Sequence, residues 1–346
     1  MNHPDTRKPR VYPVFLPHVG CPFRCIYCNQ YLVTGARPSG EILASIKRDL
    51  ENLANRAKES QKPGEVAFYG GTFASLPILM REDLLRAAAR WVKKGIFTGI
   101  RFSTRPDTIS PEFMEELDRY PVSTVELGVQ SLSDDVLRKA RRGYLAASVE
   151  KALELLRTRS WKVGFQLMVG LPGDGKSHFL YSISETIRLR PDFVRIYPTL
   201  VLKETVLEDW YKRGLYKPID LETAIELCAE AYDMLLKAGI PVIRMGLQAS
   251  PELEKPTMVV SGPYHPAFGY LVRVRWWQKS IDRLLTMQER KIGSGLRLVV
   301  PKRQISEVVG PARRNLEYLK QKWHLSSIEI LGADNLSNET FYCETI

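Results

Sequence analysis

The sequence predicts an α/β fold: a six-stranded partial (β/α) barrel followed by a small C-terminal α/β extension. Two observations support this prediction. Six short apolar runs alternate with segments of helical periodicity, an order that is typical of a parallel sheet. Right-handed crossovers between consecutive parallel strands would then curl that sheet into an open barrel.

The elements follow one another in a regular order. Strands are expected at 11–17, 65–70, 98–103, 123–129, 162–169 and 192–198. Helices are expected near 40–58, 79–94, 110–118, 177–188, 204–213 and 220–238, with two short helices between the fourth and fifth strands. Residues 10–245 would form the barrel and residues 250–346 the extension. In the extension, a helical stretch at 272–291, a strand at 295–301, a helix near 305–323 and a strand at 326–332 are expected.

Composition indicates a soluble, cytoplasmic protein. The chain has 346 residues, of which 44% are hydrophobic, and contains no run of about 18 apolar residues that would span a membrane. The N-terminal sequence MNHPDTRKPR lacks the apolar stretch of a secretory signal. In the cytoplasm thiols stay reduced, so disulfides are not expected.

Three of the five cysteines lie within the eight residues CPFRCIYC: Cys21, Cys25 and Cys28. A zinc site with His18 as a fourth ligand is one interpretation, because structural zinc takes four ligands. A 4Fe–4S cluster normally takes four thiolates, so three would leave one iron open to bind a ligand. The sequence also places Cys228 in an apolar helical pattern, which predicts a buried core residue. Cys343 is isolated, so a second cluster is not expected.

The spacing Cys-x3-Cys-x-aromatic-Cys, with Tyr27 as the aromatic residue, resembles the signature of radical S-adenosylmethionine (SAM) enzymes. The resemblance implies a 4Fe–4S cluster on the three cysteines, with SAM bound to the open iron. It also implies a low-potential electron donor, ferredoxin or flavodoxin, because reductive cleavage of SAM gives methionine and a 5′-deoxyadenosyl radical.

The predicted SAM contacts lie in loops after the strands, where catalytic residues of such barrels are found. By resemblance to the family, Gly70, Gly71 and Thr72 in FYGGTF would receive the methionine end of SAM, Ser103 the ribose, and Arg142 the carboxylate. Gln130 and Gln166 are expected nearby.

The segments VELGVQS, STRPD, GLPGD and RIYPTLVLKETVLEDWYKRGLYKP most resemble the radical SAM domain of the Elongator catalytic subunit family. Those enzymes modify the wobble uridine of tRNA and carry an additional acetyltransferase domain. Residues 250–346 are too few for an acetyltransferase, so the chain resembles a stand-alone relative. Its expected substrate is tRNA or a nucleoside, with a small anionic metabolite as the alternative.

Residues 170–177, GLPGDGKS, also match the phosphate-binding loop of nucleoside triphosphatases. That alternative function lacks a downstream magnesium-binding Asp after an apolar strand. The sequence therefore favours Lys176 and Ser177 as the start of a helix.

Positive charge concentrates in residues 255–322, which hold fourteen Lys and Arg against four Asp and Glu. Such a region suits a polyanion such as tRNA, and residues 250–346 could also cover the barrel mouth. Trp276 and Trp277 could stack on bases, although their apolar neighbours favour core positions. Tyr197, Lys203, Glu204 and His265 are further candidates for substrate contact.

Overall fold

The computed structural model describes residues 10–34, 42–248, 250–251, 253–255, 257–288 and 295–345. Its main feature is a curled, wholly parallel sheet in the order β1-β2-β3-β4-β5-β6-β8. The strands are β1 (Arg10–Phe15), β2 (Gly64–Tyr69), β3 (Phe97–Thr104), β4 (Val122–Gln130), β5 (Lys162–Val169), β6 (Phe193–Pro198) and β8 (Val242–Met245). A short antiparallel ribbon joins β7 (Val201–Leu202) to β9 (Val259–Ser261).

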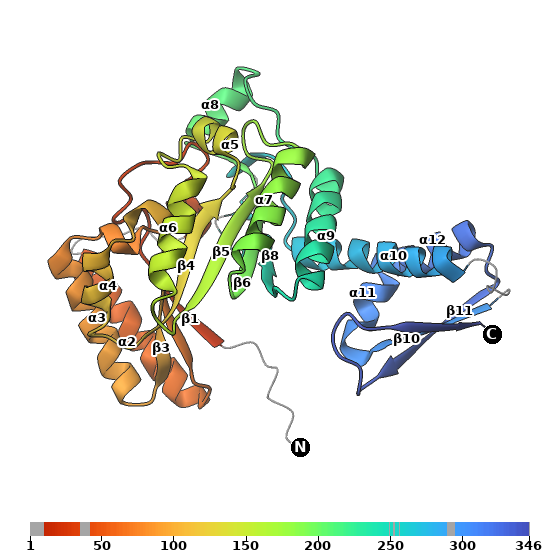
Figure 1. Cartoon of the computed structure of the whole chain (residues 1–346), viewed down its shortest axis with the longest axis horizontal. Helices are drawn as coiled ribbons and strands as arrows, with labels where there is room; N and C mark the ends of the chain where they lie inside the picture. The colour runs from red at the N-terminus through yellow and green to blue at the C-terminus, as the bar shows by residue number, and fades with distance from the viewer. Residues whose placement is uncertain are drawn as a thin grey trace.

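Helices cover the outer face of this sheet (Figure 1). They are α2 (Ile42–Ser60), α3 (Ile78–Lys93), α4 (Pro111–Leu117), α6 (Ala146–Leu156), α7 (Lys176–Leu189) and α9 (Leu221–Lys237). The short helices α1 (Gln30–Thr34), α5 (Asp134–Lys139) and α8 (Val206–Lys212) lie toward the carboxyl ends of the strands. Several begin at capping residues: Ser110, Thr205 and Asp220 each accept a hydrogen bond from a backbone N–H in the first turn of the following helix. No helix in the described ranges is long and apolar enough to cross a membrane.

The prediction of six strands is wrong by one strand. Residues 242–245 form β8, which pairs in parallel with β6 and makes the sheet seven-stranded. The other six strands lie within one or two residues of their predicted ranges. The pairing order does not return from β8 to β1, so the barrel is open. Residues 40–41 and 289–291 of the predicted helices lie outside the described residues.

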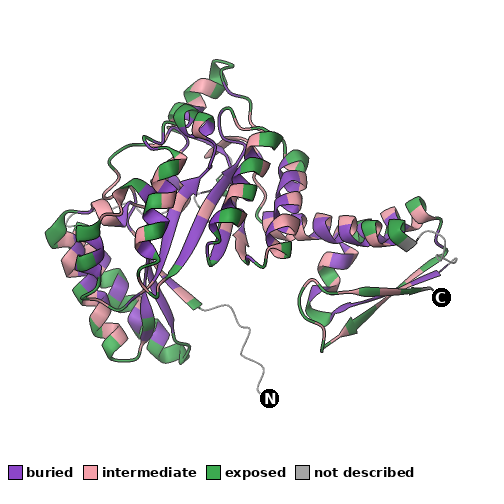
Figure 2. Cartoon of the chain, in the orientation of Figure 1, coloured by how far each residue is buried: buried purple, intermediate pink, exposed green. Residues whose placement is uncertain are grey.

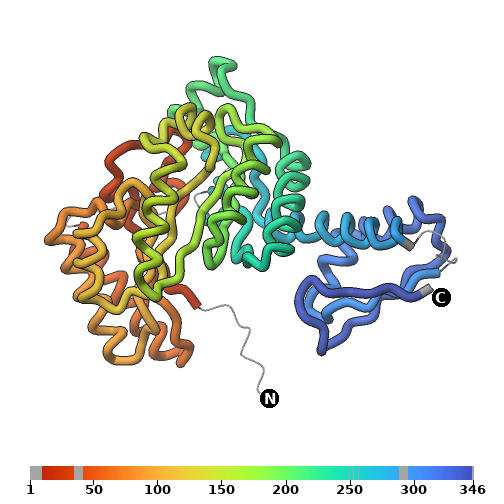
Figure 3. The backbone as a smooth tube through the Cα atoms, viewed as in Figure 1, coloured from red at the N-terminus to blue at the C-terminus, as the bar shows by residue number. Residues whose placement is uncertain are grey.

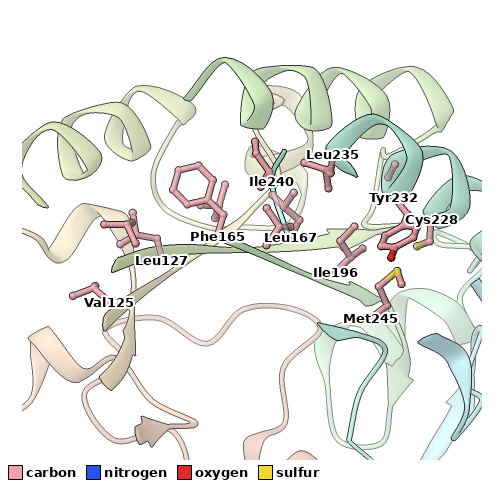
Figure 4. Packing of buried hydrophobic residues seen from close by; sticks show 14 of the residues in the cluster. Val125, Leu127, Phe165, Leu167, Ile196, Cys228, Tyr232, Leu235, Ile240 and Met245 are labelled. Carbon is pink, nitrogen blue, oxygen red and sulfur yellow. The ribbon is translucent and has the colours of Figure 1, made fainter. Parts of the chain in front are cut away.

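The apolar core lies between the sheet and its helices, where the outward-facing side chains of the strands pack (Figure 4). Leu127, Phe165 and Ile196 are among these buried residues, which come from three adjacent strands. Cys228 of α9 is fully buried in the same layer, as predicted from its helical pattern. Burial in this layer leaves the opposite face of each strand to line the barrel interior.

The last part of the chain forms a separate layer, the C-terminal unit. It contains α10 (Phe268–Gln288), α11 (Ile305–Val309) and α12 (Arg314–Trp323), with β10 (Gly295–Pro301) between β11 (Ser327–Ala333) and β12 (Tyr342–Thr345). The single helix predicted near 305–323 is therefore two helices. The helical conformation is interrupted between α11 and α12 by three positive φ angles: 73° at Gly310, 48° at Ala312 and 60° at Arg313.

The C-terminal unit extends from the β8 side of the sheet, with α10 packed on α9 (Figures 1 and 3). Trp276 and Trp277 are buried in this contact, so the core interpretation of the two tryptophans is confirmed. The outer strands β11 and β12 are partly exposed, whereas β10 between them is mostly buried, as the central sheet is (Figure 2). The hypothesis that the whole extension covers the barrel mouth is wrong for residues 268–288 and 295–345, because none of these described residues lines the cavity.

Candidate active site

A cavity of about 570 Å³ lies inside the barrel and opens at the carboxyl ends of the strands. Every cluster ligand and SAM contact that the sequence predicts lines it: Cys21, Cys25, Tyr27, Cys28, Gly70, Gly71, Thr72, Ser103, Gln130, Arg142 and Gln166. These residues come from the loops after β1 and β2, from β3, β4 and β5, and from the turn after α5. The parallel sheet therefore brings motifs that are up to 145 residues apart in the chain, Cys21 and Gln166, to one cavity.

The cysteine loop follows β1, and each thiol accepts a hydrogen bond from a different side chain. Thr72 Oγ1 lies 3.4 Å from Cys21 Sγ, Arg142 Nη1 lies 2.7 Å from Cys25 Sγ, and Gln30 Nε2 lies 3.3 Å from Cys28 Sγ. Burial raises the pKa of Cys28 to about 12 and also raises the pKa of Cys21. Both thiols therefore hold their protons at neutral pH unless a metal centre displaces them.

The three thiols are the donor set that a 4Fe–4S cluster with one open iron would use. Among the residues that the structure describes, no three His, Cys, Asp or Glu side chains gather closely enough to hold one metal ion. The thiolates of an iron–sulfur cluster bind different irons, so they do not need to converge on one point. His18, the fourth ligand of the zinc interpretation, instead accepts a hydrogen bond at Nε2 from the backbone N–H of Gln30 at 2.9 Å.

Arg142 ties the cysteine loop to the end of β4. Its guanidinium donates to Cys25 Sγ and Tyr27 Oη from Nη1, to the Gly128 carbonyl from Nη2, and to Tyr144 Oη from Nε and Nη2. The residue is 4% exposed. Because all five N–H groups of an arginine are engaged in this way, Arg142 could bind a carboxylate only by giving up one of these partners.

Arg105 is a site residue that the sequence reasoning missed, although the motif STRPD contains it. It lines the cavity, forms a bidentate ion pair with Asp107 and donates from Nη2 to the Arg142 carbonyl. Its Nη1 is buried and has no hydrogen-bond partner among the described residues. A buried donor of this kind is costly unless a ligand satisfies it, which makes Arg105 a better candidate than Arg142 for a carboxylate.

The FYGGTF loop is shaped by its contact with the chain after β1. A Cβ atom on Gly71 would lie 2.2 Å from the Val19 carbonyl oxygen and 2.7 Å from that of Leu16. Gly71 is therefore needed for close backbone packing against the loop after β1, and it also lines the cavity. Gly70 has a φ of +89°, which favours glycine at the turn that follows β2.

Two glutamines from the adjacent strands β4 and β5 are hydrogen-bonded to each other on the cavity wall. Gln166 Nε2 donates to Gln130 Oε1 at 3.2 Å, and both side chains line the cavity with Ser103. Gln130 has a φ of +65°, an uncommon conformation for a residue other than glycine. Backbone strain of this kind is often found where a side chain must be aimed at a ligand.

A charged network that the sequence reasoning also missed lies beneath these glutamines. Glu126 accepts hydrogen bonds from Tyr69 Oη and Arg101 Nε, each at 2.5 Å, and its other oxygen lies 3.1 Å from Arg195 Nε. Arg101 also pairs with Glu65 at 3.1 Å. Glu126 and Gln130 alternate with apolar residues in VELGVQ, and this period of two was a signal that the even positions face the interior.

The GLPGDGKS loop does not offer a phosphate cradle. Asp174 Oδ2 accepts a hydrogen bond from the Gly170 N–H at 2.9 Å, so the loop is closed on its own carboxylate. Lys176 begins α7 and pairs with Glu230 at 2.8 Å. A carboxylate inside the loop would repel phosphate oxygens, so the structure disfavours the triphosphatase alternative.

The remaining candidates separate into two groups. Tyr197 lines the cavity, whereas Lys203 and Glu204 are exposed beyond it. His265 does not line the cavity, and its Nδ1 accepts a hydrogen bond from the Ala267 N–H at 3.0 Å. His265 therefore has a local role in the turn before α10.

Part of the cavity wall comes from the chain after β8. Leu247, Gln248, Ser250 and Pro251 line the cavity together with Leu200 and Leu202. The β7–β9 ribbon holds this return segment in place, with Lys203 N donating to the Met258 carbonyl at 3.0 Å. Residues of the predicted extension thus reach the cavity, although the C-terminal unit does not.

Comparisons with known proteins agree with this arrangement. The family description "Radical SAM superfamily" matches residues 15–186, and the description "Radical_SAM C-terminal domain" matches residues 191–278. The chain is 29% identical over 253 residues to a "tRNA uridine(34) acetyltransferase" of Dehalococcoides mccartyi, covering 64% of this chain and 54% of the relative. It is 27% identical over 242 residues to "Elongator complex protein 3" of Saccharomyces cerevisiae, covering 59% of this chain and 43% of that protein.

Among solved structures, the archaeal Elp3 of Methanocaldococcus infernus superposes with a TM-score of 0.60 at 24% identity, over 78% of this chain and 63% of the other. This likeness establishes the fold. The chain spans about half of the length of these curated relatives or less, so their full activities do not transfer with the match. The two family matches, the curved parallel sheet and the cysteine loop after β1 together show that the chain is a member of the radical SAM superfamily.

Proposed function

We propose that this radical SAM enzyme binds a 4Fe–4S cluster through Cys21, Cys25 and Cys28 and generates a 5′-deoxyadenosyl radical from SAM. The observation that carries the proposal is the placement of all three thiols on the wall of one cavity that the other predicted contacts also line. When bound, the cluster supplies the electron that cleaves SAM, and it receives that electron from a ferredoxin or flavodoxin.

The residues of the chain have distinct tasks in this proposal. Thr72, Gln30 and Arg142 orient the three thiolates through the hydrogen bonds described above. Arg105 donates from Nη1 to the carboxylate of SAM, which satisfies a buried donor. The barrel wall excludes water, because a deoxyadenosyl radical would otherwise react with whatever reaches it.

The metal centre is tested by reconstituting the protein anaerobically with iron and sulfide. About four irons per chain are expected for a 4Fe–4S cluster, and Cys21→Ala, Cys25→Ala or Cys28→Ala should each abolish it. Cys343→Ala is the matched control and should retain the iron. Stoichiometric zinc without iron in the anaerobic protein would contradict the proposal and restore the zinc interpretation.

The SAM contact is tested with Arg105→Gln. Loss of a charge-assisted hydrogen bond should weaken SAM binding by about tenfold or more in calorimetry, while the iron content stays that of the parent. Arg159→Gln, which removes an exposed ion pair with Asp118 at 2.6 Å, is the control and should bind SAM normally. Unchanged SAM affinity in the Arg105 variant would remove Arg105 from the site.

We further propose that the substrate is tRNA, or a nucleoside within it. The support is the Elongator-like family and the basic segment 255–322. Much of that segment's charge is already paired: Arg273 with Glu307, Arg275 and Lys279 with Glu226, Arg283 with Asp233, Arg297 with Glu329, and Lys322 with Asp282. Arg313 and Arg314 are exposed, and neither forms an ion pair with the described residues. Free guanidinium groups are the ones that can neutralise phosphates.

Fluorescence anisotropy with bulk tRNA at two salt concentrations tests this part of the proposal. The double variant Arg313→Glu with Arg314→Glu should weaken binding and reduce its salt dependence, because each lost phosphate contact removes about one released counterion. Arg188→Glu, on the barrel and paired with Glu185, is the control and should bind as the parent does. If the parent shows no salt-sensitive binding, tRNA is the wrong substrate and a small anionic metabolite takes its place. The iron and SAM experiments would stand in either case.

A further inference from the structure

Two arginines on adjacent strands line the cavity. Arg195 of β6 and Arg244 of β8 are register partners in a parallel strand pair, and both line the cavity. Gln166 is in turn the register partner of Arg195 on β5. The three residues therefore form one row across the adjacent strands β5, β6 and β8. Met168 and Tyr197 form the next pair on the same face, two residues further along β5 and β6.

The charges in this row are not balanced. Glu126 faces Arg195, but it is shared with Arg101 and Tyr69 in the network described above. Arg244 forms no ion pair with an acidic residue of the described chain. Its guanidinium makes two long hydrogen bonds, from Nε to the Gly246 carbonyl and from Nη1 to Gln248 Oε1, each at 3.3 Å.

Two like charges on paired strands are an unfavourable arrangement by themselves. Like charges directly opposite one another on paired strands repel, and an arginine cannot lose its proton to relieve that repulsion. An anion placed between the two guanidinium groups would reverse the sign of the interaction. Arginine is also the side chain whose planar set of donors matches the oxygens of phosphate and carboxylate groups.

We propose that Arg195 and Arg244 form a binding site for an oxyanion of the substrate, a phosphate or a carboxylate. The hydroxyls of Tyr69 and Tyr197 lie beside it, 3.2 Å and 3.5 Å from Arg195 Nη2 and Nη1. The site lies on β6 and β8, whereas the cysteine loop follows β1 and Arg105 follows β3. This proposal rests on the proposed function in one respect: the anion is taken to belong to the substrate of a radical enzyme.

The reconstituted protein is titrated by calorimetry with inorganic phosphate, uridine 5′-monophosphate, uridine and succinate. If the site recognises phosphate, uridine 5′-monophosphate should bind at least tenfold more tightly than uridine. If it recognises carboxylate, succinate should bind where uridine does not. The anion with the higher affinity identifies the group that the site recognises. Arg244→Gln should lower that affinity by about tenfold or more, since it removes a charge-assisted contact, and Arg244→Lys should restore part of it. Arg297→Gln, which removes an arginine paired with Glu329 at 2.7 Å outside the cavity, is the control and should bind as the parent does.

Arg195→Gln is the companion variant, but it leaves Glu126 with fewer partners and could unfold the barrel, so the Arg244 variants carry the test. Equal binding of uridine 5′-monophosphate and uridine with no binding of succinate would overturn the proposal, as would unchanged anion affinity in Arg244→Gln. A parallel loss of SAM affinity in Arg244→Gln would also overturn it, because the anion would then be the SAM carboxylate. Absence of iron or of SAM binding in the parent would instead refute the proposed function, and these measurements do not depend on the added anions.

Discussion

Glu126 is the residue of the barrel interior whose replacement should be the most damaging to stability. Its side chain is 3% exposed and faces two arginines, Arg101 and Arg195, whose side chains are 3% and 13% exposed. Glu126→Gln keeps the size of the side chain and removes its charge. Arg101 keeps its second partner, Glu65, whereas Arg195 loses the only carboxylate with which it pairs among the described residues.

The expected loss in the free energy of unfolding follows from the fact that Arg195 is left without a carboxylate partner. Removing one partner of a buried ion pair costs about 3–5 kcal/mol, because the other charge remains buried without compensation. The amide can still accept one hydrogen bond from Tyr69 or Arg101, so the lower half of that range, about 3 kcal/mol, is expected. For a domain of this size, each 1 kcal/mol corresponds to about 2–4 °C in Tm, which gives a decrease of about 6–12 °C.

Thermal unfolding followed by circular dichroism at neutral pH measures this change. Glu329→Gln is the control, since it removes an ion pair of similar chemistry in which Glu329 and Arg297 are 44% and 35% exposed, and it should change the stability by less than about 1 kcal/mol. Adding Arg195→Met to Glu126→Gln should recover part of the loss, because the unpaired charge is removed. A Glu126→Gln protein that melts within 2 °C of the parent would refute the argument that the network is a buried charge pair.

Three other changes test separate features. Burial opposes ionisation of Glu65, but hydrogen bonds from Ser123 and Thr124 and the charge of Arg101 outweigh it, so the pKa of Glu65 is lowered. The parent protein should therefore lose stability as pH falls below about 4.5. The Glu65→Gln variant should show a smaller decrease in Tm between pH 7 and pH 4. Trp277→Ala should cost about 3–5 kcal/mol and make the C-terminal unit sensitive to proteolysis, without loss of iron, because the indole is fully buried there. Gly71→Ala should cost about 1–3 kcal/mol in urea unfolding, whereas Gly175→Ala, whose Cβ meets no atom within 4 Å, should change little.

The strands that could be predicted from the sequence are those with a long apolar run and turn residues at both ends. β5 (Lys162–Val169) is found at its predicted bounds. β8 has four residues, VIRM, and that length carries no usable periodicity. Its strand conformation depends on pairing with β6, a contact between distant segments that local sequence does not encode.

Some residues of the candidate site could also be predicted from local sequence, and others could not. Cysteine spacing and glycine-rich loops are local patterns, and they located the wall of the cavity. The interior network depends on which face of each strand points inward, and charged residues such as Glu126 and Arg101 are usually assigned to solvent. The break between α11 and α12 had a local signal, the dipeptide Gly310-Pro311, which marks the end of a helix.

The seventh strand also has a consequence for the dynamics of the barrel. With β8 in place, β6 has hydrogen-bonded neighbours on both sides, since Val194, Arg195 and Ile196 pair with β5 and with β8. The backbone amides of an interior strand are released only by opening of the surrounding sheet, whereas those of an edge strand fray on their own. In native-state hydrogen exchange, the amides of β6 should therefore belong to the slowest class, close to those of β4 and β5. The backbone that carries Arg195 would then move only when the barrel as a whole opens.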